Sequence, residues 1–191
     1  MKNPEHRVQT TKRLFRNALT SLLADKPLRS ITVKELCLRA KLNRGTFYSH
    51  YADIYDLMEQ VEAEMTRDFF TALDPILSAI GQPTPPRVTK KVFQCIEANA
   101  DLCKAIIGPY GNKEFARNLM CAVRDRCVPF FVRFYPNADL ARINAYFTFV
   151  SGGCLFLMEQ WLNSDLQEPA AALADAAEKI MESGVGFLQQ V

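Results

Sequence analysis

Helical periodicity of apolar residues extends along almost the whole chain and restricts the fold more than any other feature. Between residues 8 and 24, Phe15, Leu19 and Leu22 recur at three- and four-residue spacing, and similar patterns continue toward the C-terminus. No stretch of the sequence sustains the two-residue alternation that is typical of a half-buried β-strand. The pattern therefore predicts an all-α chain.

Two short helices joined by a tight turn are predicted between residues 32 and 50. Thr32 suits the N-cap of the first, and Glu35 three residues later completes a capping box. Lys41 falls in the turn, and Asn43 suits the cap of the second helix. Helices of this length are unstable alone, so they must pack on the longer helix before them. This is the arrangement of a helix-turn-helix.

The rest of the chain is expected to form longer helices. A helix capped by Asp53 should run to about residue 80, with Pro75 bending it or ending its regular part. Gly81 and the proline-rich residues 83–86 indicate a turn between helices of one domain. Further helices are expected at 86–99, 101–107, 112–134, 137–163 and 169–190, with Asp101 and Asn137 as caps.

Charge is distributed unevenly along the chain. Residues 1–51 hold eleven Lys and Arg against three acidic residues, a net charge of +8, whereas the remainder has twelve against eighteen, a net charge of −6. A basic segment joined to an acidic one indicates that the first third of the chain meets a polyanion. A solvated basic face would look the same, so motifs have to decide between the two.

Several classes of protein are disfavoured. The six cysteines form no CxxC pair and only two histidines exist, so we expect buried thiols and no zinc site, disulfide framework or cofactor. No apolar run approaches the roughly 20 residues of a membrane span, and the polar N-terminus has no signal-peptide core. From these two observations we expect a cytoplasmic protein. No catalytic residue set is visible, so we also expect that the protein is not an enzyme.

Residues 31–61, ITVKELCLRAKLNRGTFYSHYADIYDLMEQV, resemble the DNA-binding signature of the TetR/AcrR family of transcriptional regulators. The resemblance covers about residues 7–61: a Thr-led second helix, a short turn, a third helix with Thr-Phe-Tyr-x-His-Tyr, and an acid-capped fourth helix. It implies about nine helices, with a helix-turn-helix domain at 1–51 and a helical effector-binding and dimerisation domain at 52–191. It also implies a homodimer on operator DNA, usually as a repressor.

The first turn of the third helix carries side chains suited to reading DNA. Arg44 can contact guanine O6 and N7 in a bidentate manner, or reach phosphates only. Gly45 permits close approach of the backbone to DNA. Thr46 can place its methyl group against thymine or its hydroxyl on a phosphate. Phe47 is expected in the core.

The family resemblance adds further DNA contacts. It implies phosphate contacts for Tyr48 and His50 and a base or phosphate contact for Lys34, while Thr32 could bind a phosphate as it caps its helix. Packing is the alternative role for Tyr48, and a hydrogen bond to the fourth helix for His50. The family often has Gly where this chain has Lys41, which adds a charge near DNA, but Ile54 cannot hold the phosphate that a family Lys does. The predicted DNA-binding set is Thr32, Lys34, Lys41, Asn43, Arg44, Gly45, Thr46, Tyr48 and His50.

Residues 146–163 resemble the penultimate helix of many family members, whose last two helices pair with those of a second subunit. Gly152 and Gly153 are costly within a helix, and close helix approach or a kink beside a pocket would explain them. Trp161 is either an interface anchor or ordinary core. Together with Ile180, these residues form the predicted dimer interface.

Family members usually bind a small effector in the helical domain. Candidate wall residues are aromatic or sulfur-bearing, although such residues at helical spacing more often form core: Phe93, Cys103, Tyr110, Phe131, Tyr146 and Phe149. The buried part of this domain has few obvious charges, which favours an apolar or neutral effector. Control by a protein partner is the alternative, and non-specific DNA binding is a third, less favoured hypothesis.

Overall fold

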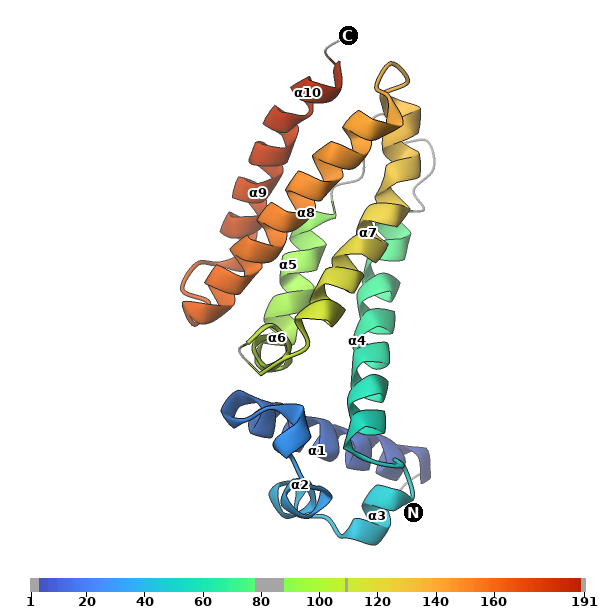
Figure 1. Ribbon diagram of the computed structural model, residues 1–191, viewed down its shortest axis with the longest axis vertical. Coiled ribbons are helices and arrows are strands. Elements are labelled where there is room, and N and C mark those ends of the chain that lie inside the picture. The colour runs from blue at the N-terminus through green and yellow to red at the C-terminus, as the bar shows by residue number, and fades with distance from the viewer. Residues whose placement is uncertain (1–3, 78–87, 109, 190–191) are drawn as a thin grey trace. The chain divides into compact units, whose positions relative to one another are not determined.

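The computed structural model describes residues 4–77, 88–108 and 110–189, and these residues form helices without any strand (Figure 1). The all-α prediction is therefore confirmed. The ten α-helices of the described residues exceed the expected nine only because residues 169–190 divide into α9 and a four-residue α10. The elements are α1 (Pro4–Asp25), a 3₁₀ turn (Leu28–Ser30), α2 (Val33–Ala40), α3 (Arg44–Tyr48), α4 (Ile54–Leu77), α5 (Thr89–Ala98), α6 (Ala100–Ile107), α7 (Lys113–Phe134), α8 (Leu140–Asn163), α9 (Ala170–Gly184) and α10 (Gly186–Gln189).

The chain divides into two compact units. The first contains residues 1–66 and 101–113, so the beginning of α4 and most of α6 join α1, α2 and α3. The second contains residues 67–100 and 114–191. This division differs from the predicted boundary between residues 51 and 52, which remains a functional prediction. The difference arises because α4 passes through both units.

Aromatic packing holds the first unit together. The buried ring of Phe15 on α1 meets the edges of Phe47 at 5.5 Å and of Tyr51 at 5.9 Å. Leu19 and Leu36 are fully buried with them. The short helices α2 and α3 therefore gain their stability from packing on α1, as their length requires.

The fourth helix begins as predicted. Asp53 accepts a hydrogen bond from the backbone N–H of Asp56 at 2.9 Å, and Ile54 is buried beside it. Pro75 lies inside the helix, which continues to Leu77. The predicted end of this helix near residue 80, the turn at residues 81–86 and the start of the next helix at 86 lie outside the described residues.

The second unit has aromatic clusters of its own. Phe131 on α7 contacts Tyr146 and Phe147 on α8, with ring centroids 5.6 and 4.7 Å apart, and Phe93 on α5 contacts Trp161 on α8 at 5.5 Å. Within this unit α5 and α8 each contact α9. Within this unit α8 therefore packs against α5, α7 and α9.

Two predicted caps are wrong. The helix α8 starts at Leu140, and its cap is Asp139, whose carboxylate accepts from the Arg142 backbone N–H at 2.7 Å, and not Asn137. Asp101 lies in the first turn of α6 instead of before it. In both cases an acidic or amide side chain lay within two residues of the true start, and the pattern alone did not resolve the position.

The helix α8 is more apolar than the sequence analysis anticipated. By length and composition alone it could cross a membrane, with a mean hydropathy of 1.3 over its most apolar 18 residues, although one such helix is weak evidence of a span. Only 17% of that window is buried inside the structure. A long apolar helix is thus largely uncovered in the single chain.

Candidate nucleic-acid interface

A complete capping box starts α2. The Thr32 hydroxyl accepts from the Glu35 backbone N–H at 3.2 Å, and Glu35 accepts from the Thr32 backbone N–H at 3.1 Å. Lys26 donates to the same carboxylate at 2.6 Å. The hydrogen bonds from Lys26 first, and then from Thr32, lower the pKa of Glu35 to about 2. The predicted box is confirmed, and the lysine that extends it had not been predicted.

The turn between α2 and α3 depends on a left-handed residue. Lys41 has φ 56° and ψ 38°, and its backbone N–H returns to the carbonyl oxygens of Cys37 and Leu38. The Leu42 N–H also bonds to the Cys37 carbonyl, at 3.0 Å. Lysine adopts this conformation at a cost of about 1 kcal/mol, which glycine would not incur. The turn thus has the geometry for which many family members use glycine.

Asn43 controls the first turn of α3. Its side-chain oxygen accepts from the Thr46 backbone N–H at 2.7 Å and from the Thr46 hydroxyl at 3.0 Å. A methyl group added at Gly45 would lie 3.3 Å from that same oxygen, which is a tight contact. Gly45 therefore leaves room for the cap, a role additional to the close approach to DNA that the sequence indicated.

The helix α3 has a buried and an exposed side. Phe47 is fully buried against Phe15, which confirms it as a core residue. Arg44 and Gly45 are exposed, and Tyr48 is 59% exposed although its ring meets the edge of Phe47 at 5.3 Å. An exposed phenol is suited to a phosphate contact, so the surface position of Tyr48 favours that role over packing.

The start of α4 is linked to α1 by polar contacts. Lys12 donates to the Gln60 side chain at 3.3 Å, and Gln60 in turn donates to Asp56 at 3.0 Å. Asp56 also accepts from the Ala52 backbone N–H, and these two hydrogen bonds lower its pKa. These hydrogen bonds thus connect α1 with the start of α4 within the first unit.

The nine predicted DNA-binding residues come together on α2, on α3 and in the segments next to them. Seven are exposed, and Thr46 and His50 are half-buried. The hydroxyl bond from Thr46 to Asn43 was not predicted. The Asn-x-x-Thr spacing was a usable signal for it, since an N-cap oxygen faces the third residue of its helix. Leu38, which is 79% exposed and lies one turn beyond Lys34, was not predicted as a surface residue either.

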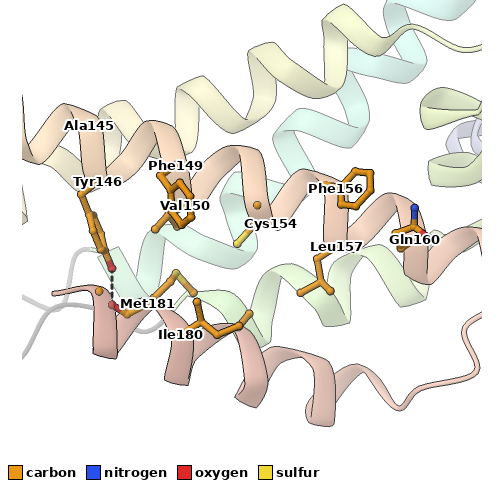
Figure 2. A pocket seen from close by; sticks show the side chains of 13 residues that line it. Ala145, Tyr146, Phe149, Val150, Cys154, Phe156, Leu157, Gln160, Ile180 and Met181 are labelled. Atoms are coloured by element: carbon orange, nitrogen blue, oxygen red, sulfur yellow. Dashed lines mark hydrogen bonds between the residues drawn. The ribbon is translucent and has the colours of Figure 1, made fainter. Parts of the chain in front are cut away.

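An apolar groove lies between α8 and α9 in the second unit, with a volume of about 620 Å³ (Figure 2). Tyr146, Phe149, Gly153 and Ile180 are among its lining residues. The Tyr146 hydroxyl crosses from α8 to α9 and donates to the Met181 carbonyl at 3.0 Å. No atom lies within 4 Å of a methyl group added at Gly152 or Gly153. Three of the four predicted interface residues therefore lie on open surface or beside the groove.

Trp161, the fourth, is buried within the single chain. It contacts Phe93 and donates its indole N–H to the Glu168 carbonyl at 2.8 Å. The alternative that Trp161 is an ordinary core residue therefore replaces its predicted interface role, because its ring packs against Phe93 on α5.

The six predicted pocket residues do not lie together, because two belong to the first unit and four to the second. Cys103 and Tyr110 belong to the first unit, and Tyr110 is exposed. The other four belong to the second unit, where Phe93 and Phe131 are core residues and only Tyr146 and Phe149 line the groove. Aromatic residues at helical spacing mostly formed core here.

Comparison with known proteins gives a family-model match and a shorter match to a curated relative. Residues 84–183, just over half of the sequence, match the family model TetR_C_8, described as a transcriptional regulator C-terminal region. An uncharacterised HTH-type transcriptional regulator of Bacillus subtilis, YxbF, is 36% identical over 58 residues, which are 30% of this chain and 15% of that protein. The chain thus matches only a small part of the length of that relative.

Solved structures share the fold. The fatty acid degradation regulator FadR of Bacillus halodurans superposes with a TM-score of 0.71 at 12% identity, covering 95% of this chain and 96% of that one. A TetR transcriptional regulator of Streptococcus agalactiae has a TM-score of 0.60 at 20% identity, covering 93% and 96%. A regulator of this family from Aquifex aeolicus has a TM-score of 0.67 at 12% identity, covering 90% and 98%. At these identities the likeness concerns the fold alone.

Proposed function

This chain belongs to the TetR family of transcriptional regulators, and on that premise we propose that it is a homodimeric repressor that releases its operator when a small effector binds. The observation that carries the DNA-binding part is that seven of the nine predicted contact residues on and beside α2 and α3 are exposed, while Phe47 anchors α3 in the core. A helix-turn-helix places its second helix in the major groove.

Within this proposal the residues of the interface divide into three groups. Arg44 and Thr46 face base edges from the first turn of α3, where direct readout is possible. Lys34, Lys41, Tyr48 and His50 bind phosphates and set the position of the helix on the duplex. Thr32 and Asn43 cap their helices, and their exposed positions also leave them within reach of the DNA backbone.

We further propose that α8 and α9 form the dimer interface. Phe149 and Phe156 are 79% and 62% exposed on α8, and Ile180 is 65% exposed on α9. Apolar side chains in such number on two adjacent helices indicate a surface that another molecule covers. The open space around Gly152 and Gly153 permits a second helix to approach closely. A dimer would place two α3 helices about 34–36 Å apart, one turn of DNA.

The proposed effector is an apolar or neutral small molecule bound by the second unit. Tyr146 and Phe149, the two predicted wall residues that line the groove between α8 and α9, support this class of ligand. The effector would act through α4, since this helix contributes residues to both units. Shifting such a two-state protein almost completely requires about 5.5 kcal/mol of differential binding.

Selection from a pool of randomised duplexes with the purified full-length protein tests DNA binding. We expect an inverted repeat to be enriched, because two-fold protein symmetry is mirrored in the operator. Recovery of no common sequence would contradict the proposal.

Effector control is tested by adding a panel of apolar and neutral compounds to the preformed complex with the selected duplex. Release by one compound class, with no effect on a complex of an unrelated repressor, is the expected result. If no compound releases the DNA but a protein co-purified from the source cells does, the regulator answers to a protein partner instead.

A further inference from the structure

The arrangement of side chains around α3 decides which atoms can reach the groove floor. Successive residues of a helix are rotated by about 100°, so residues two apart lie on nearly opposite sides. Phe47 is fully buried, and Gly45 therefore lies near the centre of the outward side. Thr46 lies at one edge of that side and Tyr48 at the other. The central position thus has no side chain.

This missing side chain allows a short neighbour to reach DNA. A side chain at position 45 would project farther toward the groove than that of Thr46, and its Cβ atom would lie only 3.3 Å from the Asn43 side-chain oxygen. With glycine there, the half-buried Thr46 can approach a base although its side chain has only three heavy atoms. Thr46 is therefore placed to contribute to specificity.

The hydrogen bond to Asn43 decides which part of Thr46 the DNA meets. A threonine hydroxyl has one hydrogen to donate, and Thr46 donates it to the Asn43 side-chain oxygen at 3.0 Å. Phosphate oxygens only accept hydrogen bonds, so the hydroxyl in this orientation has nothing to offer them. The Thr46 hydroxyl oxygen therefore points toward Asn43. The γ-methyl group, on the other branch of the Thr46 side chain, is the part left for the DNA to meet.

We propose that Thr46 is a specificity-determining residue that recognises the C5 methyl group of a thymine through its own γ-methyl group, with Asn43 as the residue that holds it in position. This inference rests on the proposed function, since it requires α3 to lie in the major groove. The thymine methyl group is exposed there, and apolar side-chain atoms are its natural partners.

The test uses the duplex selected from the randomised pool, with each thymine replaced in turn by deoxyuridine, which lacks only the methyl group. We expect one thymine in each half-site whose replacement weakens wild-type binding about fourfold, the order expected for one buried methyl group. Two variants separate the ends of the side chain. T46S keeps the hydroxyl and removes the methyl group, whereas T46V keeps a methyl group and removes the hydroxyl.

The expected result is that T46S binds the thymine and deoxyuridine duplexes equally at that position, while T46V still distinguishes them. If T46S keeps the discrimination and T46V loses it, the hydroxyl reads the base, for example by accepting from an amino group, and the proposal is overturned. Equal deoxyuridine profiles for wild type and T46S would also overturn it. Circular dichroism confirms that each variant folds.

Asn43 has its own pair of variants, compared by the ratio of affinities for the thymine and deoxyuridine duplexes. N43D keeps the oxygen that accepts from Thr46, so the ratio should stay near fourfold even if overall affinity falls. N43G still suits a helix start but frees the hydroxyl, so the ratio should approach one. An unchanged ratio in N43G would show that Asn43 does not hold Thr46 in position. Failure of wild type to select any sequence would instead overturn the proposed function itself.

Discussion

Arg44 is the residue on which base discrimination should depend most strongly. It is exposed at the first position of α3, directly after the Asn43 cap. We expect R44A to weaken operator binding by about 1–3 kcal/mol per half-site, roughly 5- to 150-fold, with little change in binding to scrambled DNA. Fluorescence anisotropy with both duplexes measures this.

R39A is the matched control for this variant. Arg39 lies in the same unit and is exposed, but it donates to Ser21 on α1 at 2.9 Å. Its loss should change both affinities slightly and equally. If R44A weakens binding to the two duplexes by the same factor, Arg44 contacts only the phosphate backbone.

Glu35 should make the stability of the first unit depend on acid pH. Its folded pKa of about 2 lies below the ordinary value of 4.5, because Lys26 and Thr32 donate to its charged form. The stabilisation is thus present above about pH 4.5 and is lost as the pH falls toward 2. Urea unfolding midpoints measured across this range should show a smaller decrease for E35Q than for wild type. Parallel profiles of the two proteins would contradict the assigned cause.

At the scale of elements, the turn between α2 and α3 stores strain at Lys41. Its left-handed backbone, with φ 56°, suits glycine better than any residue with a side chain. K41G and K41A both remove the charge, but only K41G relieves the strain. We expect K41G to be more stable than K41A by about 1 kcal/mol, measured by thermal unfolding. Equal melting temperatures would show that the turn carries no strain.

The helices α8 and α9 should control assembly. F149D and F156D each place a charge on the exposed apolar face of α8, within the lining of the groove. Loss of these rings from both copies should raise the dimer dissociation constant at least about a hundredfold, measured by sedimentation equilibrium. V132D is the control, since Val132 is exposed on α7. A dimer that persists in F149D and F156D would place the interface elsewhere.

Elements with strong local signals were predictable from the sequence. The capping box of Thr32 and Glu35, the Asn43 cap and the Asp53 cap all depend on side chains that bond within three residues. The N-cap of α8 was placed two residues too early, because Asn137 and Asp139 are both acceptable caps and a periodic pattern does not fix a helix boundary to one residue.

At the scale of the whole molecule, the contacts that join distant segments were not predictable. Asn112 donates to Glu62 at 2.8 Å, and burial raises the pKa of that carboxyl, yet fifty residues separate the two and no local pattern connects them. The predicted effector-site residues lie apart from one another for a related reason. Helical spacing identifies an apolar face but does not tell whether another helix or a ligand covers it, as Phe93 and Trp161 illustrate.

The central claim is that this chain is a dimer that reads one DNA sequence, and the ratio of two dissociation constants tests it most directly. The measurement compares the selected duplex with a scrambled duplex of the same composition at several salt concentrations. We predict binding of two subunits per site and a preference of at least about a thousandfold at physiological salt. Equal affinity for both duplexes, with the same steep salt dependence, would reduce the interface to a basic surface and contradict the claim.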